Sequence, residues 1–353
     1  MRAIKKMAKA PGVEYFENIE KPSPAADEVL FKVKAAAICG TDYSCWQWNK
    51  AGERFNDKYG ARYPFVLGHE CCGIVEEVGA DVIDIKVGDK IAIETHIYCG
   101  ECYQCKSGDA HNCQDLKIYG FSCDGAFAEY ATAPAKCAYK LPEVVSFEQG
   151  ALFEPAGVAM FALREADVKP DDTVMIYGCG PIGQMGIMLA LAYGVKNVIA
   201  VDIDDFRVNQ ARELGAIGVN SMKQDLGEVV KEVCAERGGV DVILEISGAA
   251  SIYDTMADYL RKEGKIMLLA HPGERVSFDI MKTMHHSGAT IKGIFGRRIW
   301  DSWDVLTDLV ASGKVDLTKV VTHRFPLSAG NKAFEQIAAG GSGKILFMPE
   351  WED

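Results

Sequence analysis

The chain has 353 residues, of which 48% are hydrophobic and 25% are charged, and its formal net charge is −12. This composition excludes a largely disordered chain, and the length predicts two domains because one hydrophobic core rarely grows so large. The acidic charge disfavours nucleic acid and anionic membrane surfaces as partners, and without an apolar run of about 18 residues or a signal-peptide core we expect a cytoplasmic protein.

Residues 1–153 are predicted to form a β-rich domain. Short apolar runs at 29–33, 73–78 and 90–94 are separated by Lys-Pro, Val-Gly-Ala and Val-Gly-Asp turn signals. No long helical period interrupts them, which favours a barrel-like module. Cys71 and Cys72 fall at strand positions and are interpreted as small buried hydrophobic residues.

Four cysteines share one polar loop with the spacing C-x2-C-x2-C-x7-C: Cys99, Cys102, Cys105 and Cys113. Steps of this kind let successive thiolates converge on one ion, and structural zinc sites use four such ligands. An iron–sulfur cluster is the alternative, but there is no second cysteine group and no following Cys-Pro. Four unligated cysteines in such a loop would be open to oxidation. We therefore predict a structural zinc site.

Residues 154–296 are predicted to form a doubly wound domain. Apolar strands alternate here with helical periods, a pattern typical of a parallel sheet covered on both faces. The strand 174–177 runs directly into a glycine-rich turn and an apolar helix. The turn contains Gly178, Cys179, Gly180, Pro181, Ile182 and Gly183.

An acidic residue, Asp202, ends the next strand, as dinucleotide-binding units require. The glycines would let backbone N–H groups approach a pyrophosphate at the positive helix end. Asp202 would bind ribose hydroxyls and repel a 2′-phosphate, which favours NAD over NADP. Arg207 would either stack near the adenine, invite NADP or remain solvated. A simple glycine turn with a capping aspartate is the alternative to the whole site.

Two further segments follow strands that end near the glycine turn. We expect the first, which comprises Leu269, Ala270 and His271, to line the nicotinamide site, together with Ile294 and Phe295. His285 and His286 lack partners at ligand spacing and are interpreted as structural. From residue 297 the pattern is mixed again, and we expect 297–353 to return to the first domain.

Several motifs occur in one order along nearly the whole chain. They are AICGTD at 37–42, GHE followed by G-x-V-x-x-V-G at 68–79, the four-cysteine loop, FEP at 153–155 and GCGPIG at 178–183. In this order they resemble the zinc-dependent medium-chain dehydrogenase/reductase family. The resemblance is closest to its L-threonine 3-dehydrogenase branch, through the stretches 94–96, 292–297, 321–325 and 341–344. Polyol dehydrogenases of the sorbitol type come next.

The resemblance implies a GroES-like catalytic domain joined to a Rossmann domain. It also implies a second, catalytic zinc held by Cys39, His69 and a carboxylate. In that scheme Glu70 is a ligand or alternates with water, and Glu154 is a ligand or a close neighbour. A zinc-activated alcohol would pass a hydride to NAD, and the family forms dimers and tetramers.

The resemblance further implies a proton relay through Thr41, two residues after Cys39. The branch places a histidine three residues beyond that hydroxyl, whereas this chain has Ser44. His96 either takes over the relay or only supports the metal loop. Residues 43–63 form a longer segment than the family suggests, and its aromatic and basic side chains predict a substrate-facing loop, a subunit contact or a plain surface loop.

These features predict oxidation of a secondary alcohol, namely L-threonine to 2-amino-3-oxobutanoate, with NAD and two zinc ions. A polyol, cyclitol or sugar dehydrogenase with the same chemistry is the alternative. A module from another class, such as a zinc-loop binding protein or a dinucleotide sensor, would keep the scaffold without the catalytic metal.

Overall fold

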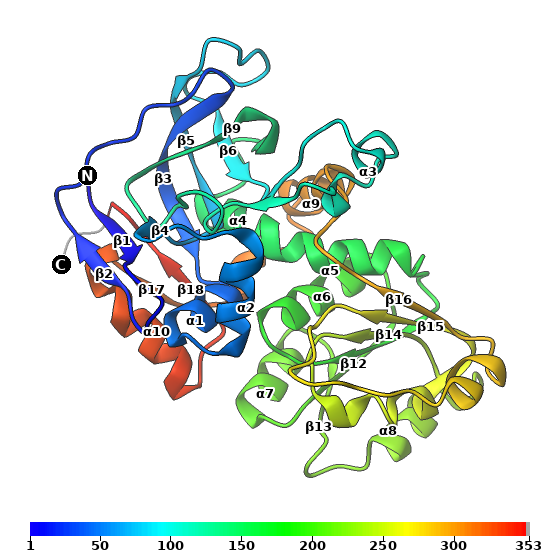
Figure 1. Cartoon of the computed structure of the whole chain (residues 1–353). Helices are drawn as coiled ribbons and strands as arrows, with labels where there is room; N and C mark the ends of the chain where they lie inside the picture. The colour runs from blue at the N-terminus through cyan, green and yellow to red at the C-terminus, as the bar shows by residue number, and fades with distance from the viewer. Residues whose placement is uncertain (351–353) are drawn as a thin grey trace. The chain divides into compact units, whose positions relative to one another are not determined.

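The computed structural model describes residues 1–350, and the chain divides into two compact units (Figure 1). The first unit comprises Met1–Pro155 and the chain from Arg298 onward, and the second comprises Ala156–Arg297. Helix α5 (Phe153–Glu165) begins in the first unit and ends in the second. Within the described residues, no helix has both the length and the apolar character needed to cross a membrane.

A mixed sheet with the strand order β10-β6-β5-β3-β18-β17 forms the centre of the first unit. The long strand β3 (Glu28–Ala37) pairs antiparallel with β5 (Glu70–Val78), and β18 (Lys344–Phe347) pairs with the end of β3. The last described strand therefore belongs to the same sheet as the first long one. The other strands of this unit are β1 (Ala3–Lys6), β2 (Glu14–Phe16), β4 (Phe65–Val66), β6 (Lys90–Ile93), β7 (His96–Ile97), β8 (Lys117–Ile118), β9 (Tyr130–Pro134), β10 (Ala138–Lys140) and β17 (Val321–Phe325).

Alternate side chains of these strands meet in one apolar core, as half-buried strands require. The largest fully buried members include Phe31, Phe127, Phe334 and Phe347. Cys71 and Cys72 of β5 are 1% and 0% exposed. This confirms the prediction that they are small buried residues. Helices α3 (Tyr103–Lys106), α4 (Phe147–Ala151), α9 (Asp301–Ala311) and α10 (Gly330–Ala339) complete the unit.

The segment 43–63 is helical, and the interpretation of it as a loop was wrong. It contains most of α1 (Gly40–Gln47) and all of α2 (Lys50–Tyr59). The Asn49 side chain accepts hydrogen bonds from the Ala51 and Gly52 N–H groups at the start of α2. Gly60 ends α2 in the left-handed conformation, with φ at 68°. Both capping signals are present in the sequence, but the aromatic and basic composition suggested a binding loop.

The two helices pack closely on each other and on the core of the first unit. A Cβ atom on Gly52 would lie 2.3 Å from the Ser44 carbonyl oxygen, so only glycine allows this approach. Phe55 of α2 packs edge-on against Phe121, with 4.7 Å between ring centroids. Trp46 of α1 stacks on Phe334, with centroids 5.6 Å apart. This aromatic packing excludes a plain surface loop.

Six parallel strands form the sheet of the second unit, in the order β13-β12-β11-β14-β15-β16. This is the order 3-2-1-4-5-6 of doubly wound nucleotide-binding sheets. The strands are β11 (Thr173–Tyr177), β12 (Asn197–Asp202), β13 (Ile217–Asn220), β14 (Val240–Glu245), β15 (Leu260–Leu268) and β16 (Thr290–Gly293). They alternate with α6 (Pro181–Ala192), α7 (Asp205–Glu213) and α8 (Leu226–Val233).

Helices cover both faces of this sheet, as continuous apolar strands predict. On one face, Gly186 of α6 lies against Ile176 and against Ala159 of α5. On the other face, Met175 and Tyr177 share a core with residues of α8. Successive residues of β11 therefore pack against helices on opposite faces of the sheet, as the predicted doubly wound fold requires. His285 and His286 lie on the surface at the turn Met281–His285.

We predict that Asn49→Ala loosens α2 locally, because two N–H groups at the helix start lose their acceptor. The expected cost is about 1 kcal/mol, or about fivefold faster amide exchange in peptides covering 50–59. Asn49→Ser keeps a capping oxygen and is the matched control. Equal acceleration in both variants would show that the cap is not what holds α2.

Candidate active site and metal centres

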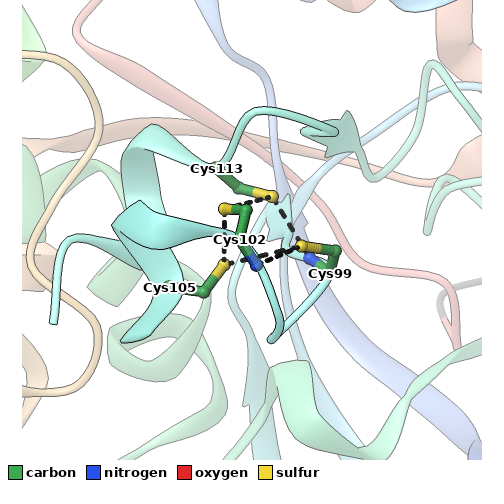
Figure 2. A group of neighbouring side chains, drawn as sticks. All are labelled: Cys99, Cys102, Cys105 and Cys113. Atoms are coloured by element: carbon green, nitrogen blue, oxygen red, sulfur yellow. Dashed lines mark hydrogen bonds between the residues drawn. The ribbon is translucent and has the colours of Figure 1, made fainter. Parts of the chain in front are cut away.

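The four-cysteine loop brings its sulfurs to one point (Figure 2). Cys99 follows β7, Cys102 occupies the N-cap position of α3, Cys105 lies within α3, and Cys113 follows the short helix Ala110–Asn112. All four sulfurs lie within 4.8 Å of one another. The Sγ–Sγ distances are 3.5 Å for 102–105 and 3.9 Å for 99–105 and 102–113.

These distances fit a single tetrahedral ion. Zinc–thiolate bonds of about 2.3 Å place the sulfurs of a tetrahedron about 3.8 Å apart. A disulfide would need a separation of about 2.05 Å, and the cysteines are free. A multi-iron cluster would spread the thiolates farther, so the geometry favours zinc over the iron–sulfur alternative.

The surroundings of the sulfurs also suit thiolates. Backbone N–H groups of Cys99, Gly100, Glu101 and Cys102 donate to sulfurs of the loop. Backbone N–H groups of Gln114 and Cys105 lower the pKa of the Cys102 thiol to about 6. Burial raises the pKa of Cys105 to about 12, and a bound cation would favour the thiolate form of these cysteines.

A second cluster joins three residues that are far apart along the chain. Cys39 is the N-cap residue of α1 just beyond β3, His69 precedes β5, and Glu70 is its first residue. One ligand atom from each lies within 4.8 Å of the other two. The antiparallel register explains this arrangement, because Ala37 of β3 pairs directly with Glu70.

Two charged residues that the sequence analysis missed support this cluster. Asp42 is fully buried; its Oδ1 lies 3.4 Å from His69 Nδ1, and its Oδ2 accepts a hydrogen bond from the Cys39 N–H at 3.0 Å. Lys344 Nζ lies 2.7 Å from Glu70 Oε1. Carboxylates beside ligand histidines fix the ring and leave Nε2 for the metal. The Asp in CGTD was the signal available for Asp42.

Several acidic groups are buried together at this cluster. Burial raises the pKa of Glu70 to about 7. Burial alone would lower the pKa of His69, but the charges of Asp42 and Cys39 raise it well above its usual value. A site that pulls protons onto an imidazole in this way also attracts a metal cation. The donor set of thiolate, imidazole and carboxylate suits zinc.

The remaining predicted catalytic residues lie at different distances from this cluster. Thr41 Oγ1 lies 3.7 Å from Cys39 Sγ. Glu154, near the start of α5, is 7% exposed and close enough for its charge to act on Glu70 and Lys344, but it is outside the three-residue ligand group. Ser44 lies on α1 and is half-buried.

His96 is tied to the base of the four-cysteine loop. Its Nδ1 lies 2.8 Å from Glu94 Oε1, and the indole N–H of Trp303 donates to the other Glu94 oxygen at 3.2 Å. Glu94 and Trp303 are fully buried. These contacts fix one nitrogen of the His96 ring, and they leave both interpretations of His96 open.

In the second unit, the glycine turn connects β11 to α6 with the geometry of a phosphate-binding loop. Gly178 adopts φ of 94°, and Gly180 is the N-cap residue of α6. A Cβ on Gly183 would lie 1.9 Å from the Gly178 carbonyl oxygen, whereas a Cβ on Gly180 would meet nothing within 4 Å. Gly183 is therefore required by packing, and the open space at Gly180 suits the approach of a ligand phosphate. Pro181 and Ile182 form the first turn of α6.

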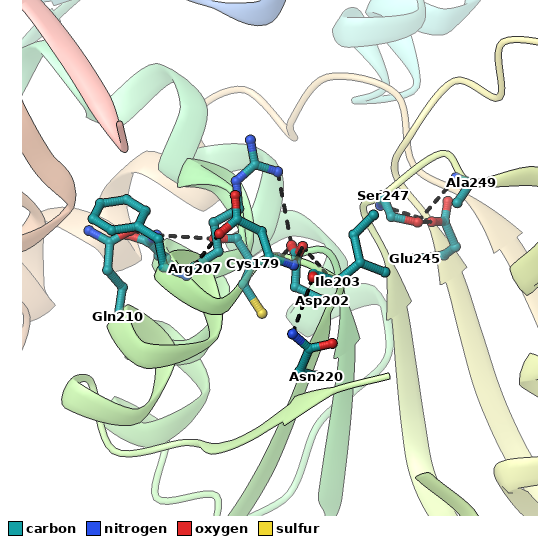
Figure 3. A network of polar contacts seen from close by, with 12 residues as sticks. Cys179, Asp202, Ile203, Arg207, Gln210, Asn220, Glu245, Ser247 and Ala249 are labelled. Carbon is teal, nitrogen blue, oxygen red and sulfur yellow. Dashed lines mark hydrogen bonds and ion pairs between the residues drawn. The ribbon is translucent and has the colours of Figure 1, made fainter. Parts of the chain in front are cut away.

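Asp202 lies next to this turn, at the end of β12 (Figure 3). Its Oδ2 accepts a hydrogen bond from the Cys179 N–H at 2.8 Å, and its Oδ1 accepts from the Ile203 and Asp204 N–H groups. Arg207 Nη1 is 4.0 Å from Asp202 Oδ2, and its side chain is 45% exposed. The carboxylate is thus held at the site of ribose recognition in doubly wound folds.

The other predicted cofactor segments follow the carboxyl ends of β15 and β16. The Ala270 N–H donates to the Glu245 carbonyl, and the Ile294 N–H donates to the Leu268 carbonyl. Leu269 is buried, Ala270 and Phe295 are half-buried, and His271 is exposed. Ligands of open parallel sheets bind at this edge.

Sequence reasoning missed Glu245, which ends β14 and is fully buried at the same edge. Its Oε1 accepts hydrogen bonds from the Ser247 hydroxyl and from the Ser247 and Gly248 N–H groups. Its Oε2 accepts from the Tyr253 hydroxyl at 2.9 Å. Figure 3 shows Glu245 beside Ser247 and Ala249. Glu245 therefore fixes this loop, in which Gly248 lies against Ala270 and His271.

Two family models match the chain. One is described as the alcohol dehydrogenase GroES-like domain and matches residues 25–143, and the other is described as zinc-binding dehydrogenase and matches residues 181–312. An L-threonine 3-dehydrogenase from Pyrococcus abyssi is 39% identical over 354 residues, covering 99% of this chain and 98% of that protein. These matches confirm the predicted fold class, a GroES-like domain with a doubly wound domain.

Solved structures resemble the whole chain as well. An alcohol dehydrogenase from Escherichia coli CFT073, complexed with NADH, superposes with a TM-score of 0.87 at 29% identity and 99% coverage of both chains. A protein described as a zinc-binding dehydrogenase, from Sinorhizobium meliloti and bound to NADP, superposes with a TM-score of 0.86 at 29% identity, again with 99% coverage of both chains.

We predict that the purified protein contains about two zinc ions per chain and that Cys102→Ser lowers this to about one. The variant loses one thiolate of the tetrahedral site, and its unfolding temperature should fall because metal binding stabilises the loop. Elemental analysis and a thermal scan measure both effects. Cys234→Ser, a buried cysteine of the second unit, is the control and should keep both ions. Iron in the wild-type protein would contradict the assignment.

Proposed function

The chain belongs to the zinc-dependent medium-chain dehydrogenase/reductase family, and on that premise we propose that it oxidises L-threonine to 2-amino-3-oxobutanoate with NAD as the hydride acceptor. As a member of this family it is an alcohol dehydrogenase. The single observation that carries the substrate is the full-length identity of 39% to an L-threonine 3-dehydrogenase.

We propose that Cys39, His69 and a carboxylate, Glu70 or Glu154, hold a catalytic zinc ion. When bound there, zinc would act as a Lewis acid that lowers the pKa of the substrate hydroxyl. Asp42 orients the His69 ring, and Lys344 balances part of the buried negative charge. The four cysteines of the loop would hold a second, structural zinc with no part in the chemistry.

The proton of the substrate hydroxyl needs an acceptor near the metal ligands. Thr41 would take this role, and the position of its hydroxyl beside the thiol of Cys39 supports it. Ser44, three residues further along α1, is a second hydroxyl on the same helix. His96, whose Nδ1 is held by Glu94, would either join this relay or support the metal loop that begins three residues later.

The second unit would bind NAD at the carboxyl edge of its sheet. The turn at 178–183 would accept the pyrophosphate at the start of α6, and Asp202 would accept hydrogen bonds from the adenosine ribose. Arg207 would lie near the adenine. Leu269, Ala270, His271, Ile294 and Phe295 would line the nicotinamide, with Glu245 holding the neighbouring loop. The carboxylate of Asp202 would repel a 2′-phosphate, and this supports NAD although one similar structure binds NADP.

A polyol, cyclitol or sugar substrate is the second candidate. The observation that favours it is Ser44, which stands where the L-threonine branch is expected to have a histidine. A catalytic zinc and a hydroxyl relay would serve either class of secondary alcohol. We also propose that the protein is a cytoplasmic homodimer or homotetramer, as its family resemblance implies.

We predict that the enzyme reduces NAD with L-threonine, measured by the absorbance of NADH, and that Cys39→Ser abolishes this activity because the metal loses a ligand. The panel includes D-threonine, L-serine, sorbitol, xylitol and myo-inositol. Turnover of a polyol without turnover of L-threonine would replace the first candidate by the second.

We predict that Asp202→Asn raises the preference for NADP relative to NAD by at least about tenfold, because the repulsion of a 2′-phosphate is removed. The measurement is the ratio of kcat/KM for the two cofactors. Asp204→Asn is the control, since this neighbouring carboxylate caps α7 through the Phe206 N–H. A ratio that changes equally in both variants would argue against ribose recognition by Asp202.

A further inference from the structure

Lys344 and Glu70 form a buried ion pair beside the proposed catalytic zinc ligands. Lys344 Nζ lies 2.7 Å from Oε1 of Glu70 and 2.5 Å from Oε2, so both carboxylate oxygens face the ammonium group. The two residues are 4% and 1% exposed. Water therefore screens this attraction little, and removing either partner would leave an uncompensated buried charge.

The register of three strands brings Lys344 to this place. Ala37 of β3 pairs with Glu70 on one side and with Leu346 of β18 on the other. The Ile38 N–H donates to the Ile345 carbonyl at 3.0 Å, one residue before Cys39. Lys344, the first residue of β18, is thereby carried to the end of β3 where the metal ligands gather.

Zinc and Lys344 would both draw on the carboxylate charge of Glu70. One carboxylate oxygen of Glu70 is within 4.8 Å of the ligand atoms of Cys39 and His69. A zinc–carboxylate bond of about 2.0–2.2 Å would place this oxygen on the metal. The ammonium and the zinc ion repel each other, and each weakens the hold of the other on the carboxylate. Glu70 would therefore be shared between two cations.

We propose that Lys344 is a positioning residue that weakens Glu70 as a ligand of the catalytic zinc, so that the substrate hydroxyl displaces Glu70 easily. This inference rests on the proposed function, because it requires zinc at the cluster of Cys39, His69 and Glu70. Without the lysine charge, Glu70 would stay on the metal and close the position that the substrate needs.

The test compares Lys344→Met with Lys344→Arg. Methionine keeps the apolar stem without the charge, and arginine keeps the charge as the matched control. The first readout is the rate at which a chelator removes the catalytic metal. This metal is recognised as the kinetic phase that the Cys39→Ser variant lacks. The second is the visible absorption of the cobalt-substituted protein, which reports the ligands around the metal.

Lys344→Met should lose its catalytic metal about tenfold more slowly than the wild type, with an altered cobalt spectrum and a lower kcat, because Glu70 becomes a full ligand. Lys344→Arg should keep the wild-type spectrum. Adding Glu70→Gln to Lys344→Met should remove the slow phase. Unchanged or faster metal loss in Lys344→Met, with its unfolding temperature retained, would overturn the proposal.

The single variant Glu70→Gln gives a measurement that does not depend on the folding of the lysine variants. A weak ligand predicts metal loss within about threefold of the wild type, whereas a full ligand predicts a protein that no longer retains the catalytic metal. The second outcome would overturn the role of Lys344 while leaving the dehydrogenase intact. A wild-type protein without zinc at Cys39 and His69, or without alcohol oxidation, would instead reject the proposed function.

Discussion

The burial of negative charge at the end of β3 is the constraint on which the first unit depends. Three carboxyl groups, those of Asp42, Glu70 and Glu154, are 0%, 1% and 7% exposed, and the thiol of Cys39 lies among them. Such burial needs compensation by cations or by protonation, since isolated buried charges cost several kcal/mol each. Burial raises the pKa of Glu70 to about 7, Lys344 supplies one positive charge, and the proposed zinc would supply more. The sheet register that aligns β5, β3 and β18 is what makes this compensation possible.

The two proposed metal centres differ in how far apart their ligands lie along the chain. The four-cysteine site is local: its ligands fall within 15 consecutive residues and the backbone N–H groups of the loop itself serve the sulfurs. The catalytic site draws on β3, β5 and β18 and so depends on the whole sheet. A change in the loop should therefore act on the stability of one segment, whereas a change at the sheet centre acts on chemistry and fold together.

The helical pair α1 and α2 belongs to the same arrangement. The Phe121 ring contacts both Phe55 of α2 and the ring of His69. The centroids of Phe121 and His69 are 5.8 Å apart. Cys39 caps α1, and Asp42 in its first turn faces His69. Segment 43–63 therefore supports the proposed metal ligand His69 through Phe55 and Phe121.

The sequence by itself determined the features whose parts are adjacent along the chain. The spacing of Cys99 to Cys113 predicts one metal, because a short loop keeps its four thiolates close enough to bind the same ion. The turn at 178–183 between an apolar strand and a helix, with Asp202 ending the next strand, predicts the doubly wound sheet and its ligand edge. In both cases the local backbone carries the information.

Only the tertiary structure decided the features that join distant residues. The CGTD motif points to Asp42 without showing that it faces His69, and nothing local shows that Lys344 lies beside Glu70. Both contacts depend on the register of β3, β5 and β18. The helices in 43–63 were missed for a related reason: composition suggested a binding loop, but capping at Asn49 and packing on Phe121 and Phe334 decide the conformation. Long-range pairing is set by the burial of the whole sheet, and no single stretch of sequence contains it.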